Sequence, residues 1–198
     1  RKVAASVAYP QGLVEVQDAA SQAVIEGLEI TAGMKVLDYC AGGGGKVLAM
    51  AAAAPKAKFV AHDVDAGRTG DIPVRAKRAG AKISMAAPYE ADAQGPYDLV
   101  VVDAPCSGSG TWRRTPEAKW RLTPERLNEL VGIQVEILAA VAPMVASGGR
   151  IALPCSPLWR AASARSTDTR RETPGSRMVT PDSCCAASMV ALLWVTNR

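Results

Sequence analysis

The chain has 198 residues, 48% of them hydrophobic and 21% charged, which is enough apolar material for one domain with a buried core. It contains no run of about 18 uncharged apolar residues, and its first residues lack the apolar stretch of a signal peptide. The net charge of +4 is too small by itself to indicate a nucleic-acid partner. Because the chain begins with Arg1 rather than Met, we interpret it as a fragment or a processed product.

The cysteines favour an intracellular protein with reduced thiols, because their number is odd and a secretion signal is lacking. With no CxxC pair and a single histidine, a structural zinc site is not expected. We therefore expect a cytoplasmic monomer without a metal and without a membrane partner. The five cysteines are Cys40, Cys106, Cys155, Cys184 and Cys185.

Helices and short apolar strands are predicted to alternate along the chain. Apolar residues recur at helical spacing from Val16 to Leu28, with Val16, Ala20, Val24 and Leu28 on one face. The elements expected after this helix are a strand over residues 34–38, a helix up to residue 54, a strand over 58–63, a helix over 72–79, a weak strand over 82–85, a buried strand over 97–103, a long helix starting at 123–125 and ending before 148, and a strand over 150–153.

This alternation predicts an α/β fold of the Rossmann-like type, a mostly parallel sheet with helices on both faces. The periodicity ends at Pro154, and residues 160–183 are rich in Arg, Ser, Thr and Pro. Only the apolar run 189–195 could form another strand, so we expect the C-terminal strands to be incomplete. We divide the chain into a catalytic domain, residues 1–156, and an irregular tail, residues 157–198, which we interpret as frame-shifted or disordered.

Four consecutive glycines, Gly42 to Gly45, follow the first expected strand. Such residues let the backbone approach a ligand closely and leave N–H groups at a helix N-terminus. Asp63, at the end of the next strand, stands where a ribose partner is found in nucleotide-binding sheets. A tight turn without a ligand is the alternative. A loop of this type also serves nicotinamide, flavin and S-adenosylmethionine alike, so it does not select a cofactor.

A second loop, Asp103-Ala104-Pro105-Cys106-Ser107-Gly108, follows the apolar strand over 97–103. That strand delivers an acid, a proline and a cysteine to the carboxyl edge of the sheet, where ligands bind in such folds. The small residues after the cysteine leave room for a flat base. A free cysteine is more often a small core residue, but these neighbours favour a reactive site.

Residues 98–110 resemble the DAPCSGxG motif of the Sun/Nop (RsmB-like) family of RNA cytosine-5 methyltransferases. Residues 16–22 are similar to the family's VQDxxS segment, and residues 38–46 resemble its DxCAxPGGK cofactor loop with Gly in place of Pro. The basic segment 111–121 is similar to that of the bacterial ribosomal-RNA branch. These motifs occur in family order over about residues 12–156. The family's usual upstream RNA-binding domain is not evident.

The resemblance implies a methyltransferase that uses S-adenosylmethionine to methylate carbon 5 of a cytosine in RNA, with ribosomal RNA as the expected substrate. It implies that Cys155 is the nucleophile and that Cys106 assists release of the product. Asp103 would hydrogen-bond the base, Pro105 would help to place the ring, and Lys46 would border the active site.

The resemblance also implies the binding residues. The residues expected to bind the cofactor are Asp38, Cys40, Ala41, Gly42, Gly43, Gly44, Gly45, Lys46, Asp63, Arg68 and Asp103. The residues expected to bind RNA are Arg113, Arg114, Lys119 and Arg121. We expect His62 only to end a strand, and we assign no function to Cys184 and Cys185.

Three departures from the family pattern leave alternatives open. The spacing from Arg150 to Cys155 is one residue shorter than in the family, and Pro154 replaces a threonine. The acid expected after the third strand is not evident, since residues 85–87 are Met-Ala-Ala and Asp92 comes later. The acidic segment expected after the second cysteine motif is absent. The alternatives are an inactive fragment that binds S-adenosylmethionine or RNA, a DNA cytosine-5 methyltransferase with a Pro-Cys nucleophile, and a nicotinamide-dependent oxidoreductase.

Overall fold

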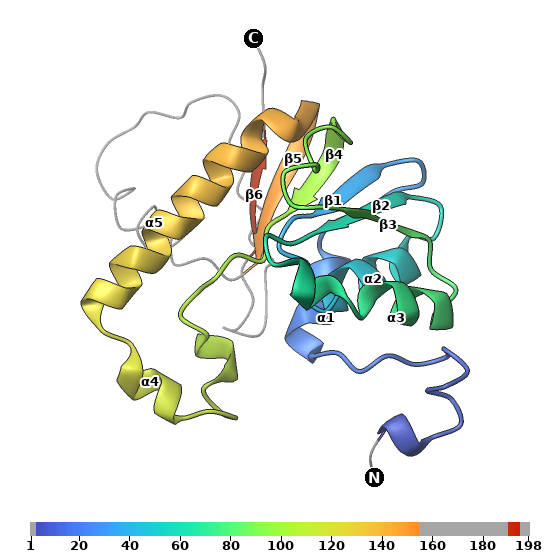
Figure 1. Cartoon of the computed structure of the whole chain (residues 1–198), viewed down its shortest axis with the longest axis horizontal. Helices are drawn as coiled ribbons and strands as arrows, with labels where there is room; N and C mark the ends of the chain where they lie inside the picture. The colour runs from blue at the N-terminus through green and yellow to red at the C-terminus, as the bar shows by residue number, and fades with distance from the viewer. Residues whose placement is uncertain (1–2, 155–189, 195–198) are drawn as a thin grey trace.

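The computed structural model describes residues 3–154 and 190–194. Its centre is a six-stranded sheet in the order β3-β2-β1-β4-β5-β6 (Figure 1). Strands β1 to β5 pair in parallel, and β6 pairs antiparallel with β5. The strands are β1 (Lys35–Asp38), β2 (Lys58–His62), β3 (Ile83–Ala86), β4 (Tyr97–Val101), β5 (Val145–Pro154) and β6 (Val190–Trp194).

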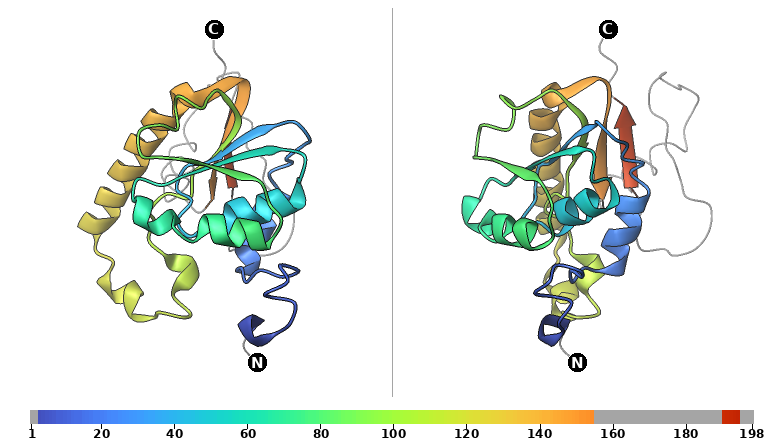
Figure 2. Two further views of the ribbon diagram at one scale, coloured as in Figure 1. Left: turned by 45° about the vertical axis from the view of Figure 1, so that its right-hand side comes forward. Right: turned by 90° about the vertical axis from the view of Figure 1, so that its right-hand side faces the viewer.

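Helices cover both faces of this sheet, which confirms the expected three-layer α/β architecture (Figures 1 and 2). Three helices pack on one face: α1 (Ala19–Glu26), α2 (Gly45–Ala53) and α3 (Ile72–Arg78). The long helix α5 (Pro124–Val141) packs on the other face. The short helix α4 (Glu117–Arg121) precedes α5. Short 3-10 turns span Val3–Ala5, Ala66–Thr69, Ser109–Thr111 and Ala142–Met144.

Strand β4 has apolar side chains on both faces of the sheet, so both faces must be covered by helices. Its side chains alternate between two apolar clusters, with Leu99 and Val101 facing α1 and α2, and Val100 facing α5. All three are fully buried. Each such side chain contributes roughly 1.5–3 kcal/mol when removed from water. A run that is apolar on both faces is typical of a central parallel strand.

The strand order reverses between β1 and β4, the two central neighbours. In open parallel sheets the loops after such strands diverge and leave a crevice at their carboxyl ends. The loop after β1 carries the four glycines, and the loop after β4 carries Cys106. Both motifs therefore meet at the one edge where this fold binds ligands.

Two elements differ in their bounds from the sequence-based expectation, and helix α4 was not expected. Helix α1 begins at Ala19, and Val16, which was expected on its buried face, lies outside it with 61% of its surface exposed. Strand β5 begins at Val145 rather than at Arg150, because a register shift against β4 takes up extra residues. Gly148 permits that shift with its φ of +77°, a conformation that a residue with a Cβ rarely adopts.

Helix α5 starts as expected: the Thr123 hydroxyl accepts a hydrogen bond from the Arg126 amide at 3.2 Å, and Pro124 occupies the first turn. With the following 3-10 turn it is long and apolar enough to cross a membrane by length and composition alone. This is weak evidence, because a core helix passes the same test. Its buried residues are Leu130, Gln134 and Val141, and Val141 belongs to the apolar cluster on this face of the sheet.

Candidate active site

The glycine loop after β1 requires residues without a side chain at two of its four glycine positions. Gly44 has a φ of +82°, and a Cβ built on it would lie 2.7 Å from Cγ1 of Ile72 in α3. Gly42 has a φ of +50°, and its Cβ would lie 3.1 Å from the Arg68 guanidinium. The loop therefore lies close against α3 and the segment after β2, and it leads directly into the first turn of α2.

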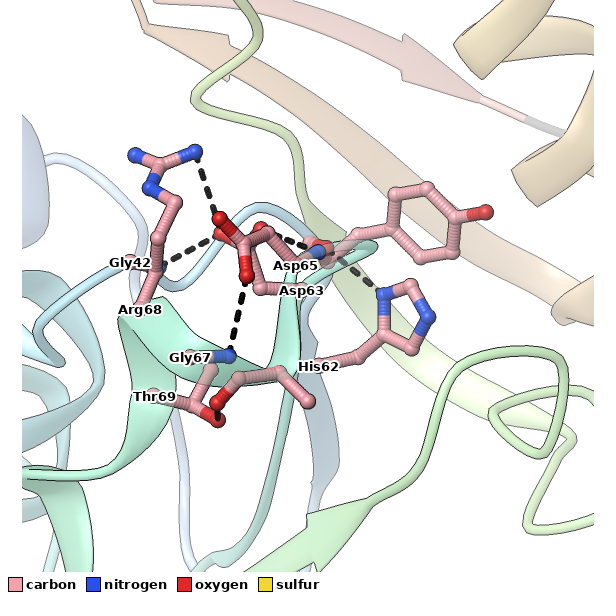
Figure 3. A network of polar contacts seen from close by, with 9 residues as sticks. Gly42, His62, Asp63, Asp65, Gly67, Arg68 and Thr69 are labelled. Atoms are coloured by element: carbon pink, nitrogen blue, oxygen red, sulfur yellow. Dashed lines mark hydrogen bonds and ion pairs between the residues drawn. The ribbon is translucent and has the colours of Figure 1, made fainter.

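Asp63 supports this loop from beneath (Figure 3). One carboxylate oxygen accepts a hydrogen bond from the Gly42 amide at 2.9 Å and lies 3.4 Å from the Arg68 guanidinium. The other accepts from the Asp65 amide at 3.1 Å. Asp63 is only 3% exposed, so these contacts compensate for the burial of its charge. The residue expected to meet a ribose thus also holds the backbone that would bind the rest of the cofactor.

Two further side chains hold the loop, and the sequence analysis assigned this role to neither of them. Gln17 donates from Nε2 to the Gly45 carbonyl at 2.9 Å, and Arg75 of α3 donates to the Gly43 carbonyl. Arg75 and Arg78 both pair with Glu15, which ties the segment before α1 to α3. These pairs join residues about 60 positions apart in the chain, a separation at which local periodicity carries no information.

Asp38, at the end of β1, is the most unusual acid of the site. It is 1% exposed, and neither of its carboxylate oxygens has a hydrogen-bond partner of normal geometry among the described residues. Burial raises its pKa from 3.8 to about 7, while the Lys46 charge and the Val47 amide counter only part of that effect. A buried acid without a partner is costly. It is the kind of group that a cationic ligand would satisfy.

The cysteine loop after β4 is joined to the glycine loop by an ion pair. Lys46, at the start of α2, lies 2.5 Å from Asp103, and their side chains are 16% and 36% exposed. Pro105 is exposed and Cys106 is half-buried. The two motifs, 57 residues apart in the chain, therefore form one surface.

A pocket of about 250 Å³ lies at this junction. It brings together most of the residues that the sequence singled out for the cofactor. Gly44 and Asp63 are buried beneath it, and Gln17 and Ser21 of the N-terminal motif add to its wall. The predicted residues that line it are Asp38, Cys40, Ala41, Gly42, Gly43, Gly45, Lys46, Arg68 and Asp103.

Cys40 lines this pocket but is not suited to be a nucleophile. Burial raises the pKa of its thiol to about 12, and the nearby carboxylates of Asp38, Asp63 and Asp103 act in the same direction. A thiol with that pKa is almost entirely protonated near neutral pH, and only the thiolate attacks carbon. Its role is in packing and in shaping the pocket.

A second pocket, of about 260 Å³, opens beside the ends of β2 and β3. Its wall includes Tyr39, His62, Val64 and Asp92. The rings of Tyr39 and His62 are stacked with centroids 4.4 Å apart, and His62 ends β2 as expected. Asp92 comes late after β3 in the sequence, yet the loop returns it to this edge of the sheet.

The four basic residues expected to contact RNA are all exposed. They lie between the cysteine loop and α5, and α4 contains two of them. Arg114 lies 3.4 Å from Asp18 of the N-terminal motif. Trp120, 81% exposed, lies between Lys119 and Arg121, and the Lys119 ammonium is 5.4 Å from its ring centroid. The sequence interpretation assigned no role to this indole, although an aromatic between two cations is typical of nucleic-acid surfaces.

Cys155, the expected nucleophile, lies outside the described residues, as do Cys184 and Cys185. The structure does show that β5 runs through Pro154, the residue before Cys155, and pairs in parallel with β4. Within residues 3–154 and 190–194, no three His, Cys, Asp or Glu side chains gather as a metal ion would require.

Comparison with known proteins identifies the family. The family described as 16S rRNA methyltransferase RsmB/F matches residues 26–168. The chain belongs to this family. The ribosomal RNA small subunit methyltransferase B of Enterobacter sp. (strain 638) is 39% identical over 148 residues, which cover 72% of this chain and 35% of that protein. The protein of the same name from Salmonella arizonae is 34% identical over 186 residues, covering 88% of this chain and 43% of that protein.

The fold agrees with this assignment. A solved structure described as NSun6 from Pyrococcus horikoshii with SFG covers all of this chain and 57% of its own, with a TM-score of 0.77 and 17% identity. The fold is therefore the Rossmann-like fold of S-adenosylmethionine-dependent methyltransferases, and the cofactor class expected from the sequence is confirmed. The family does not fit the nicotinamide and DNA alternatives. The chain spans about a third of the length of the Enterobacter relative.

Proposed function

We propose that this RsmB/F domain transfers a methyl group from S-adenosylmethionine to carbon 5 of a cytosine in ribosomal RNA, in the cytoplasm. The observation that carries the proposal is the meeting of two loops at the switch point of the sheet. One offers a glycine cradle beside the buried Asp38, whose carboxylate oxygens lack a hydrogen bond of normal geometry, and the other offers Asp103, Pro105 and Cys106. Lys46 joins the two loops through its ion pair with Asp103.

The residues of the first pocket fit the cofactor. S-adenosylmethionine supplies an electrophilic methyl group on a positively charged sulfur. Lys46 and Arg68 pair with Asp103 and Asp63, which leaves the Asp38 carboxylate, when ionised, as the extra negative charge in the pocket wall that suits such a cation. The positive φ values of Gly42 and Gly44 keep side chains out of the cradle. We infer that the ribose lies beside Asp63 and the Gly42 amide that it holds, and that the second pocket beside Asp92 accepts the nucleoside end.

The chain's own residues supply the rest of the chemistry. Carbon 5 of cytosine is a poor nucleophile until a thiolate adds to carbon 6, and Cys155 is the residue proposed to add. Asp103 would hold the pyrimidine ring through a hydrogen bond to its ring nitrogen, with Pro105 against the ring. After methyl transfer, the carbon-5 proton must leave before the sulfur–carbon bond breaks, and we assign this step to assistance by Cys106.

Tritiated S-adenosylmethionine and small-subunit ribosomal RNA test the proposal directly. We expect label on carbon 5 of a cytosine in the RNA. Label on DNA alone, or on another atom of the RNA, would contradict the assignment. Cofactor binding in a calorimeter without any transfer at saturating RNA would instead support the inactive-fragment alternative, which the short Arg150–Cys155 spacing keeps open.

Replacing Asp63 should weaken cofactor binding. Asp63→Ala removes a charged acceptor and leaves the Gly42 amide without its partner, so we expect a loss of about 1–3 kcal/mol in binding free energy. Asp63→Asn keeps an acceptor for that amide and should lose less. Calorimetric titration with S-adenosylmethionine measures both variants. A dissociation constant unchanged in Asp63→Ala would contradict the role proposed for this residue.

The basic segment should contribute salt-dependent RNA affinity. Because each cation that contacts a phosphate releases bound counterions, we expect Arg113→Gln with Arg121→Gln to reduce the slope of log affinity against log salt by about one to two. Filter binding of ribosomal RNA between low and moderate salt measures that slope. Arg126→Gln, on the exposed start of α5 and paired with Glu129, serves as a control for the loss of an arginine charge outside the basic segment. Equal slopes in all proteins would indicate a solvated loop.

A further inference from the structure

Gln134 is a buried amide on an otherwise apolar surface. It lies in the middle of α5 and is 1% exposed, and the other buried residues of this helix are Leu130 and Val141. The other four buried polar or charged residues of the described chain belong to the ends of β1 and β2 or to the turn after β2. Burying an amide costs free energy unless its groups are hydrogen-bonded. A glutamine at this place therefore needs a specific partner.

Its partner is the cysteine loop. The Gln134 Nε2 donates to the carbonyl oxygen of Pro105 at 2.7 Å, across 29 residues of sequence. Pro105 immediately precedes Cys106, and their shared peptide plane includes that carbonyl. Residues 102–108 have no regular secondary structure after β4 ends at Val101. Proline has no N–H of its own with which to anchor the loop, and the Gln134 amide holds the carbonyl side of the next peptide.

We propose that Gln134 is a positioning residue for Cys106, which orients the Pro105–Cys106 peptide by its hydrogen bond from α5. This inference rests on the proposed function only for the effect on methylation. A planar peptide held at its oxygen fixes the position of the Cys106 N–Cα bond, from which the thiol side chain is built. Displacement of a reacting group by about 1 Å can cost about 100-fold in rate. The geometry of Cys106 is thereby coupled to the packing of α5 on the sheet.

Gln134→Met is the variant of choice, because methionine has similar length and volume but donates no hydrogen bond. Leu138→Ala is the matched control. Leu138 lies one turn along α5 and packs against the apolar cluster that contains Val141, so its truncation destabilises the helix packing without removing the donor. Denaturant unfolding of both variants establishes how much stability each has lost.

Two readouts follow. The first is single-turnover methyl transfer to ribosomal RNA together with cofactor affinity. We expect Gln134→Met to lower the transfer rate about 10- to 100-fold with an unchanged cofactor dissociation constant, and Leu138→Ala to retain most of the rate. The second is the iodoacetamide labelling rate of Cys106, followed by mass spectrometry, with free cysteine added to the same sample as the reference thiol. We expect the ratio of the two rates to change at least about twofold in Gln134→Met only.

The labelling ratio separates this inference from the proposed function, because it needs neither RNA nor turnover. If the parent chain is inactive but the ratio changes in Gln134→Met alone, the positioning role stands and the methyltransferase proposal fails. If the ratio and the transfer rate are unchanged in Gln134→Met, or change equally in Leu138→Ala, Gln134 only packs α5 and the inference is wrong.

Discussion

Cys106→Ser is expected to trap RNA on the protein, whereas Cys155→Ser is expected to trap none. A serine hydroxyl is far less nucleophilic than a thiolate near neutral pH, so Cys155→Ser should lower methyl transfer by about 10³-fold or more. In Cys106→Ser the sulfur–carbon bond to carbon 6 should still form and carbon 5 should still gain its methyl group. The adduct should then persist, because loss of the carbon-5 proton and release of the sulfur lack their assisting group.

Denaturing gels with radiolabelled ribosomal RNA measure the adduct, and Cys184→Ser is the control because no function is assigned to that cysteine. Adducts in Cys155→Ser only would make Cys106 the nucleophile, which is the arrangement of the Pro-Cys alternative. If neither variant forms an adduct and the parent does not methylate, the short spacing before Cys155 has removed a usable nucleophile. The inactive-fragment alternative then holds.

Asp38→Asn is expected to stabilise the ligand-free protein at pH 7 and above. The folded pKa of Asp38, about 7, lies above its unfolded value of 3.8, so folding favours the protonated form. The stability that the protonated carboxyl contributes to the free energy of unfolding is fully present below about pH 4, and it is lost as the pH rises towards 7. A difference of about three pKa units corresponds to as much as about 4 kcal/mol of unfolding free energy in alkaline solution. Asparagine carries no charge and escapes this loss.

Urea unfolding from pH 4 to pH 8.5 tests this expectation. The stability of Asp38→Asn should exceed that of the parent at high pH, and the difference should shrink on acidification. The exposed Glu136→Gln on α5 is the control, and its profile should follow the parent's. Parallel curves for parent and Asp38→Asn would contradict the assigned cost of burying this carboxylate.

The same group should report cofactor binding. A cation in the pocket lowers the pKa of Asp38, so binding of S-adenosylmethionine near pH 7 should release a proton. Calorimetric binding enthalpies in buffers with different ionisation enthalpies measure the number of protons released on binding. The Asp38→Asn variant should release fewer protons than the parent. Equal proton release by both proteins would assign the linkage to another group.

The sequence by itself determined the order of the elements and the two loops of the site. The apolar run at 97–103 indicated a strand buried on both faces, and β4 has its side chains in two clusters. The glycines after β1 and the acid, proline and cysteine after β4 stood at strand ends, where a parallel sheet collects its ligand-binding groups. These predictions succeeded because burial on a strand face or a helix face leaves a local pattern in the residues.

Only the tertiary structure decided how distant residues support that site. In the sequence, Gln134 is one polar residue within a long helix. Its hydrogen bond to the Pro105 carbonyl depends on how α5 packs on the sheet. Asp63 was predicted as a ligand partner, but its hydrogen bond with the Gly42 amide depends on the approach of the two loops. The missing partners of the Asp38 carboxylate likewise follow from packing around the end of β1. These residues are not related by helical or strand periodicity. Their contacts depend on how the helices and the sheet pack together, so the sequence does not predict them.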